Sequence, residues 1–356
     1  PTCTALQGRP TVSTCPRGAS MDFDDLDAEA ETRVAAGEEV AGFIKINNQP
    51  PKGTILEPIK RTKRLPKDSH LPEKARNLLP AVSNTKDLTP KIRLLCFYGA
   101  GDNVAATWAA MAHETENKEI EVATYEWPGH GIREKETLQK TLDSLCEDAF
   151  ETCKEAMDTG TFAVLGHSIG CLLATAICEK ARRELNVEPA YAIMLERGAP
   201  QFPVLSPSGQ DMLRNRIDEF LAAYGVPFVA AIGGDHGRAM WQHDMELEND
   251  NREVGWYKFS CPILSVCACR NYGMEEHSDT LDEKSKQFKK FREEQVSYYH
   301  TSYNFTRDMY EAWNDWTTHK DGAQVLYVDA DHYGVKTHPE VRRAMWKGLR
   351  DVISKF

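Results

Sequence analysis

The sequence contains no apolar run of the roughly 20 residues that a membrane-spanning helix requires, so it predicts no membrane span. Basic residues are fewer than acidic ones, so the 356 residues carry a formal net charge of −11. That charge argues against a general nucleic-acid-binding protein, whose ligand is a polyanion. Apart from Cys267-Ala268-Cys269, no cysteine or histidine pair has the spacing of a metal site. We interpret these two cysteines as buried thiols, and we expect neither a metal nor a cofactor.

A disulfide framework is missing as well, although ten cysteines are present. They are scattered, and several lie inside apolar segments, namely Cys96, Cys171, Cys178 and Cys267. This usage is typical of reduced thiols and predicts a cytoplasmic protein. Residue 1 is a proline, Met21 is a candidate start, and no clear signal peptide precedes it. A targeting segment in an incomplete N-terminus is the alternative.

Residues 1–90 differ in composition from the rest of the chain. An acidic run over 22–31 gives way to a basic, proline-containing run over 60–67. Such segments bury little apolar area, so we expect a poorly structured or loosely packed N-terminal extension. The basic run is interpreted as a solvated linker, with docking of an acidic partner as the alternative. Residues 91–356 are expected to form one domain.

Strand-like and helix-like patterns alternate from residue 91 onward. Short apolar runs predict strands at 92–97, 120–125, 162–165, 191–195, 262–266 and 324–328. Apolar residues at helical spacing predict helices between and after them, including 138–157, 169–185 and 341–353. This alternation is typical of an α/β fold with a mainly parallel sheet and helices on both faces.

Two segments interrupt the alternation. Residues 206–257 have an irregular helical pattern without an obvious strand, and a helical lid over an active site would be inserted there. Residues 275–305 are highly charged, and they predict an additional helical insertion.

Residues 161–173, TFAVLGHSIGCLL, have the pattern of a nucleophile elbow. An apolar strand meets Gly166-His167-Ser168-Ile169-Gly170, and a helical pattern follows at once. The two glycines suit a sharp turn that leaves no room for a β-carbon. Such a turn exposes the Ser168 hydroxyl, and the N–H of Ile169 faces any negative charge formed beside it. A glycine-rich loop without catalytic role is the alternative.

Serine requires a base from another loop at the same end of the sheet. His332 is our candidate among eleven histidines, because it follows the last predicted strand. A serine followed late in the chain by a histidine is the order found in an α/β-hydrolase. His130 and His167 are interpreted as local structure. We assign the second oxyanion donor to the backbone N–H of Ala100, in the small-residue loop after the first sheet strand.

Several motifs together resemble those of the type II thioesterases, the stand-alone α/β-hydrolases that edit polyketide and non-ribosomal peptide synthetases. They are Phe97-Tyr98-Gly99-Ala100-Gly101, Trp127-Pro128-Gly129-His130-Gly131, Gly166-His167-Ser168-Ile169-Gly170, Arg197-Gly198-Ala199-Pro200, Leu247-Glu248-Asn249-Asp250, Cys261-Pro262 and Asp331-His332-Tyr333. The resemblance covers residues 91–356, and the ordered set is more specific than any single motif.

This resemblance implies a monomeric enzyme that hydrolyses acyl thioesters. The acyl group would be held on the phosphopantetheine arm of an acyl or peptidyl carrier protein, with acyl-CoA as the alternative. The resemblance also implies Ser168 as nucleophile, His332 as base, and the amides of Ala100 and Ile169 as the oxyanion hole.

One position departs from the family pattern. The third triad member of the family is an aspartate a few residues past the Cys-Pro strand, and Asn271 occupies that place here. Asparagine can fix the tautomer of an imidazole but cannot stabilise the imidazolium by charge, so an enzyme relying on it is expected to be slow. Alternatively the acid comes from the charged insertion, as Glu275, Glu276, Asp279 or Asp282, or no third member works.

Two other functions compete with the serine thioesterase. One is a carboxylesterase or lipase-like hydrolase, although the chain lacks an HGGG-type oxyanion loop. The other is a catalytically impaired hydrolase fold that binds a carrier protein or scaffold, which Asn271 and the N-terminal extension motivate.

Overall fold

The computed structural model describes most of the chain after residue 70. The described residues are 71, 73–83, 89–105, 107–114, 118–224, 234–248, 257–270, 283–300 and 305–355. Residues 1–70, which are most of the predicted extension, lie outside them.

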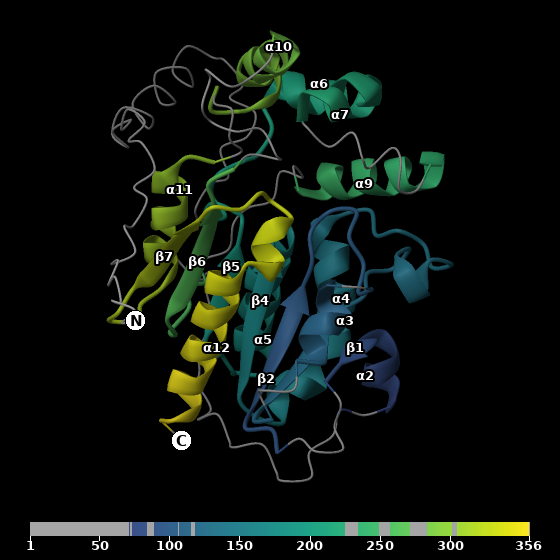
Figure 1. Cartoon of the computed structure of the whole chain (residues 1–356). Coiled ribbons are helices and arrows are strands. Elements are labelled where there is room, and N and C mark those ends of the chain that lie inside the picture. The colour runs from purple at the N-terminus through teal and green to yellow at the C-terminus, as the bar shows by residue number, and fades with distance from the viewer. Residues whose placement is uncertain are drawn as a thin grey trace, which may run out of the picture. The chain divides into compact units, whose positions relative to one another are not determined.

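A mainly parallel sheet organises this part of the chain. Its seven strands have the order β1-β3-β2-β4-β5-β6-β7 (Figure 1). They are β1 (Ala81–Val82), β2 (Ile92–Phe97), β3 (Ile120–Thr124), β4 (Phe162–His167), β5 (Ala192–Leu195), β6 (Ile263–Ala268) and β7 (Ala323–Val328). β1 pairs antiparallel with β3, and the remaining pairs are parallel. The sheet confirms the predicted α/β fold class.

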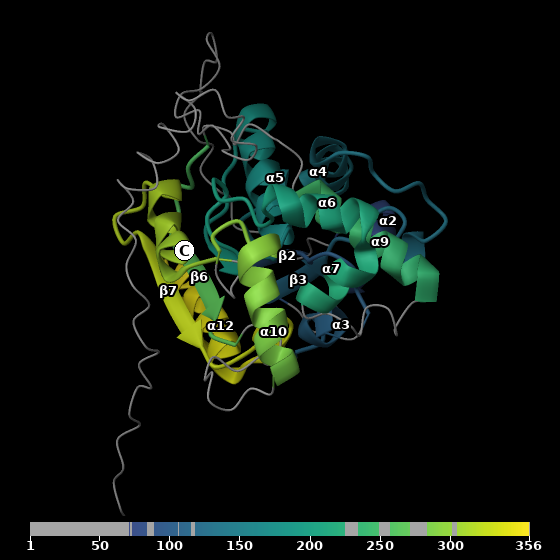
Figure 2. The ribbon, with the colours of Figure 1, turned by 90° about the horizontal axis from the view of Figure 1, so that it is seen from above.

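Helices cover both faces of the sheet. α3 (Thr107–Ala112) and α12 (Pro339–Ile353) lie on one face, and α4 (Leu142–Asp158) and α5 (Gly170–Glu184) lie on the other (Figures 1 and 2). The strands from β2 to β6 are therefore buried along their whole length. Burial on both faces explains why these strands read as continuous apolar runs rather than alternating ones.

The sheet starts before residue 91, where the sequence pattern places the beginning of the domain. α2 (Glu73–Leu78) precedes β1, whose Ala81 pairs with Thr124 of β3. The side chains of Leu79 and Ala81 are buried. Residues 71–83 thus pack against the domain instead of belonging to a loose extension. A two-residue strand has no periodicity, which is why the sequence analysis missed it.

The lid helices, α6 (Pro207–Asn215), α7 (Ile217–Tyr224) and α9 (Gly234–Glu248), lie beyond the carboxyl ends of the strands (Figure 1). They fall within the segment 206–257 that the sequence assigned to a lid. The charged insertion contributes α10 (Glu283–Phe291) and the π-helical turn η3 (Arg292–Val296). η3 joins the lid through its Val296 carbonyl, which accepts a hydrogen bond of 3.0 Å from the N–H of Ser206.

Short helices complete the described structure. They are η2 (Gly131–Arg133), α11 (Arg307–Glu311), η4 (Ala312–Trp316) and η5 (Gly334–Thr337). Across the described ranges, no helix is both long and apolar enough to span a lipid bilayer.

Candidate active site

The turn between β4 and α5 has the strained geometry of a nucleophile elbow. Ser168 has a φ of 54°, in the left-handed region that residues other than glycine rarely adopt. A Cβ on Gly170 would lie 2.2 Å from the carbonyl oxygen of Phe97. A Cβ on Gly166 would lie 2.4 Å from the backbone of α5. Both positions therefore require glycine, as the elbow pattern predicts.

The loop after β2 passes directly against this turn. A Cβ on Gly99 would lie 2.9 Å from the Cβ of Ser168. Ala100, the next residue of the loop, and Ile169, at the N-cap of α5, are both buried. Both predicted oxyanion residues are thus brought to the nucleophile, and the role of their amides stays a prediction.

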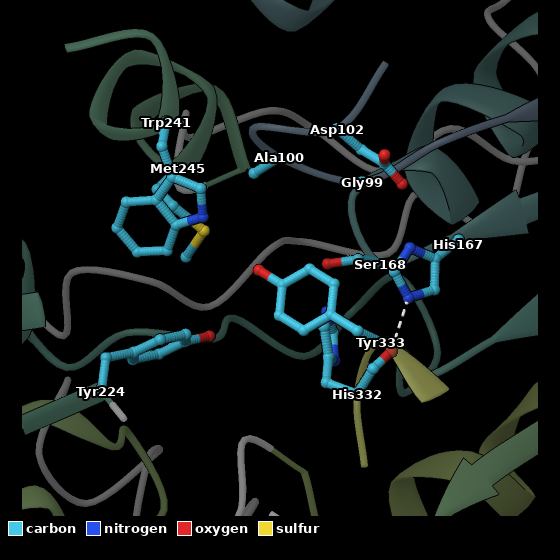
Figure 3. A pocket seen from close by; sticks show the side chains of 10 residues that line it. All are labelled: Gly99, Ala100, Asp102, His167, Ser168, Tyr224, Trp241, Met245, His332 and Tyr333. Atoms are coloured by element: carbon cyan, nitrogen blue, oxygen red, sulfur yellow. Dashed lines mark hydrogen bonds between the residues drawn. The ribbon is translucent and has the colours of Figure 1, made fainter. Parts of the chain in front are cut away.

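His332 follows β7 and reaches the elbow from the other side. Its carbonyl accepts a hydrogen bond of 2.8 Å from Nε2 of His167, the residue before the nucleophile (Figure 3). The two imidazole rings lie 4.9 Å apart, centroid to centroid. The interpretation of His167 as a residue of local structure is therefore incomplete. Its side chain joins the strand of the nucleophile to the loop of the predicted base.

Burial keeps both imidazoles uncharged. It lowers the pKa of His332 well below its usual value of 6.5, and the neighbouring His167 and Lys336 lower it further. Burial and the charge of Lys336 lower the pKa of His167 to about 3. Asp102 acts on His332 in the opposite direction without reversing the effect. A neutral His332 is in the state that a general base requires.

One cavity brings together the nucleophile, the predicted base and the lid. It is lined by Gly99, Ala100, Asp102, His167, Ser168, Tyr224, Trp241, Met245, His332 and Tyr333. Figure 3 shows the Ser168 hydroxyl and the Tyr333 ring pointing into the space that Tyr224, Trp241 and Met245 bound on the opposite side. The lid thus gives the cavity an aromatic and apolar wall.

The third triad member stays a prediction. Asn271 and its four alternatives, Glu275, Glu276, Asp279 and Asp282, lie outside the described residues. The last described residue before them is Arg270, whose N–H donates a hydrogen bond of 2.9 Å to the carbonyl of Ala330. This bond brings the chain beside the His332 loop one residue before Asn271.

Asp102 is a cavity carboxylate that the sequence analysis missed. Its Oδ2 accepts a hydrogen bond of 3.0 Å from Nε1 of Trp108 and pairs with Nζ of Lys336 at 2.5 Å. Lys336 itself is buried. The pair neutralises a buried ammonium group beside the imidazole of His332, at a place where an isolated charge would be costly.

Glu196 is a second carboxyl group that the sequence analysis missed. It directly follows β5 with a φ of 56°, and its charge after an apolar strand is the signal that could have found it. Its Oε2 accepts a hydrogen bond of 2.6 Å from the N–H of Ala268, and the hydroxyl of Tyr310 lies 2.5 Å from Oε1. Burial raises the pKa of Glu196 to about 8, although the hydrogen bonds from Tyr310 and Ala268 act in the opposite direction.

Two buried ion pairs anchor α9 of the lid. Oδ2 of Asp244 lies 2.9 Å from Nε2 of His130, and Oε1 of Glu248 lies 3.3 Å from Nε of Arg197. His130, Arg197 and Glu248 come from three separate motifs of the sequence. No local sequence pattern indicates that His130 pairs with Asp244, because the two residues are 114 positions apart in the chain. Reading His130 as local structure therefore missed its main contact.

Comparison with known proteins finds a family match for part of the chain. Residues 92–222 match the family model of the thioesterase domain. The matched segment contains Ser168, Ile169 and Ala100, and it ends before His332. The resemblance to the thioesterases is confirmed.

A curated relative of this thioesterase segment is the gramicidin S biosynthesis protein GrsT of Aneurinibacillus migulanus. The two sequences are 33% identical over 113 residues. The match covers 32% of this chain and 43% of that protein, so it spans less than half of the relative's length.

Solved thioesterase structures share the fold. RedJ, a thioesterase from the prodiginine pathway of Streptomyces coelicolor, is 20% identical with a TM-score of 0.50, covering 72% of this chain and 85% of RedJ. ClbQ from the colibactin pathway is 16% identical with a TM-score of 0.54, covering 73% of this chain and 98% of ClbQ. The type II thioesterase BorB is 16% identical with a TM-score of 0.52, covering 77% of this chain and 96% of BorB. At these identities the likeness shows the α/β-hydrolase fold alone.

Proposed function

We propose that the protein is a serine thioesterase that hydrolyses acyl thioesters through an acyl-enzyme intermediate. The observation that carries this proposal is the placement of Ser168 at a strained elbow that shares one cavity with His332. The elbow falls inside the segment that matches the thioesterase domain. That match favours a thioester substrate over the oxygen ester of a carboxylesterase.

The first half-reaction transfers the acyl group to Ser168. Its Oγ attacks the thioester carbonyl while the hydroxyl proton passes to the neutral imidazole of His332. The amides of Ala100 and Ile169 stabilise the oxyanion of the tetrahedral intermediate. Collapse of the intermediate breaks the C–S bond, and His332 returns the proton to the departing thiolate.

The second half-reaction releases the acid. Water attacks the acyl-enzyme as His332 takes its proton, and collapse returns that proton to the Ser168 oxygen. A thiol with a pKa of about 8.5 leaves more readily than an amine, so the imidazolium needs less stabilisation. We propose Asn271 as the residue that orients His332, with the carboxylates of the insertion as alternatives.

We propose a carrier-bound substrate. GrsT is named for gramicidin S biosynthesis, and ClbQ comes from the colibactin NRPS/PKS pathway. The type II thioesterases that the sequence resembles edit such synthetases, which hold acyl groups as carrier-protein thioesters. The phosphopantetheine arm of an acyl or peptidyl carrier protein is therefore the proposed thiol, with CoA as the alternative. We further propose that the enzyme acts as a cytoplasmic monomer, for which size-exclusion chromatography with light scattering should give the mass of one chain.

The decisive experiment compares acyl-CoA and acyl-pantetheine thioesters with oxygen esters of the same acyl groups. We expect thioesters to be preferred. Ser168→Ala should lower kcat by at least about 10³-fold, because the nucleophile is lost while the fold is kept. Circular dichroism and thermal unfolding of the variant provide the control for folding.

Three outcomes would contradict parts of this proposal. Oxygen-ester preference would indicate a carboxylesterase, and unchanged turnover in Ser168→Ala would remove the elbow from the reaction. If neither ester class turns over, either the enzyme requires a carrier-bound substrate or its site is impaired. A carrier-bound acyl substrate and a fluorophosphonate probe distinguish these two explanations. Failure of Ser168 to react with that probe would indicate a catalytically impaired binding protein.

A further inference from the structure

Asp244 of the lid helix α9 is a fully buried carboxylate that contacts the loop after β2. Its Oδ2 accepts a hydrogen bond of 2.8 Å from the N–H of Gly101 and a second one of 2.9 Å from Nε2 of His130. Its Oδ1 accepts a longer one of 3.3 Å from Nδ1 of His243. The carboxylate therefore joins the lid to the backbone residue that follows Ala100.

His130 holds Asp244 as an ion pair. Both ring nitrogens of His130 face acceptors, since Nδ1 donates to the Pro128 carbonyl over 3.2 Å and Nε2 donates to Asp244. An imidazole that donates from both nitrogens carries a positive charge. Burial alone would lower the pKa of His130, but the charge of Asp244 raises it overall. The same pair lowers the pKa of Asp244, so the carboxylate is ionised when it accepts the Gly101 N–H.

Trp241, one turn earlier on α9, holds Gly101 from a second direction. Gly101 has a φ of 69°, and a Cβ there would lie 2.5 Å from Cδ1 of the indole. Trp241 also lines the cavity together with Tyr333, the residue after the predicted base. Figure 3 shows Trp241 beside the loop of Gly99 and Ala100. α9 thus contacts the loop after β2 and shares the cavity with the loop of the predicted base.

We infer that Asp244 is a positioning residue that fixes the oxyanion loop, because it holds the N–H of Gly101 next to the Ala100 amide. The inference rests on the proposed function, because it takes the Ala100 amide as an oxyanion donor. Holding the N–H of Gly101 determines the orientation of the preceding peptide units. Oxyanion stabilisation depends on donors that are already in place when charge develops.

The test compares Asp244→Ala and Asp244→Asn with Glu248→Gln, using an acyl-CoA thioester. Glu248 is the matched control because it anchors the same helix one turn later, through Arg197 rather than through the oxyanion loop. Asp244→Ala should lower kcat by about 10- to 100-fold with little change in KM, because the loop loses its fixed geometry. Asp244→Asn keeps an oxygen for Gly101 and should recover part of this loss. Glu248→Gln should lower the transition temperature while kcat changes little.

Ser168 labelling by a fluorophosphonate separates this inference from the proposed function. Phosphonylation uses the same oxyanion hole, so Asp244→Ala should slow it more than Glu248→Gln even if thioesters prove not to be the substrate. Equal labelling rates and equal kcat in the Asp244 and Glu248 variants would overturn the inference. A change confined to KM would do the same, because it would mean that α9 only covers the substrate. If the alanine variant does not fold, the labelling rate and kcat of Asp244→Asn are compared with those of Glu248→Gln, and equal values overturn the inference.

Discussion

The reactivity of Ser168 depends on an imidazole that stays neutral. Burial and the neighbouring His167 lower the pKa of His332. The proton acceptor therefore remains available at pH values where an exposed histidine is already charged.

We expect kcat/KM for a thioester to rise with pH along a limb whose midpoint lies below 6.5, the usual pKa of histidine, and then to stay level through neutral pH. Below the midpoint His332 is protonated and cannot accept the proton of Ser168. Initial rates across acidic and neutral buffers check this. Thermal unfolding at each pH is the control, because the unfolded chain binds the proton more readily and acidification also destabilises the fold. A midpoint at or above 6.5 would argue against His332 as the base.

The predicted orienting residue can be tested by restoring the charge that the family pattern contains. Asn271→Asp should raise kcat, because a carboxylate stabilises the imidazolium formed during attack. If a carboxylate of the insertion already does this, kcat should stay unchanged. Single-turnover kinetics on the two proteins measures the effect on acylation. A large loss of kcat would show that Asn271 has a role other than orienting His332.

At the scale of elements, the elbow depends on how closely α5 approaches β2. The space for a side chain at Gly170 is taken by the backbone carbonyls of Phe97 and Tyr98, whose oxygens lie 2.2 Å and 2.6 Å from the position that a Cβ would occupy. Backbone atoms cannot turn aside as the end of a flexible side chain does. Gly237, inside α9, is a contrasting case, because no atom beyond its own stretch of helix lies within 4 Å of its Cβ position.

These two glycines give opposite predictions for the same substitution. Gly170→Ala should lower the free energy of unfolding by about 1–3 kcal/mol, because the strand or the helix must shift. Gly237→Ala should raise it by about 0.5–1 kcal/mol, because alanine restricts the unfolded chain and favours a helix. Urea denaturation of both variants checks the difference. Equal stabilities would contradict the close packing of α5 on β2.

At the scale of the whole molecule, the N-terminal limit of the folded domain becomes testable. Leu71, Leu79 and Ala81 are buried, and β1 extends the sheet beside β3. We propose that residues 1–70 contribute little to this packing, in line with their charged and proline-containing sequence.

A chain beginning at residue 71 should therefore unfold at nearly the same temperature as the full chain. A chain beginning at residue 91 should be less stable by roughly 3 kcal/mol, because it loses buried apolar side chains and one edge strand. Thermal unfolding and thioesterase activity of the two truncated chains check this. Equal stability of the two truncated chains would place the boundary at residue 91.

Much of the core fold was predictable because its signals are local. The strand predicted at 92–97 has those bounds in the structure, and the elbow helix predicted at 169–185 spans Gly170–Glu184. Apolar runs and helical spacing depend on neighbours in the chain, and so do the glycines of a tight turn. β1 was not predictable, since two residues form a strand there only because β3 offers them partners.

The sequence by itself determined the parallel sheet, the elbow at Ser168 and His332 as the histidine after the last strand. These features follow from short-range patterns and from chain order. Only the tertiary structure decided that His167 holds the His332 loop and that Asp244 holds both His130 and Gly101. Residues so far apart in sequence meet because α9 packs over the strand ends, and no local pattern encodes which buried charge will face which donor.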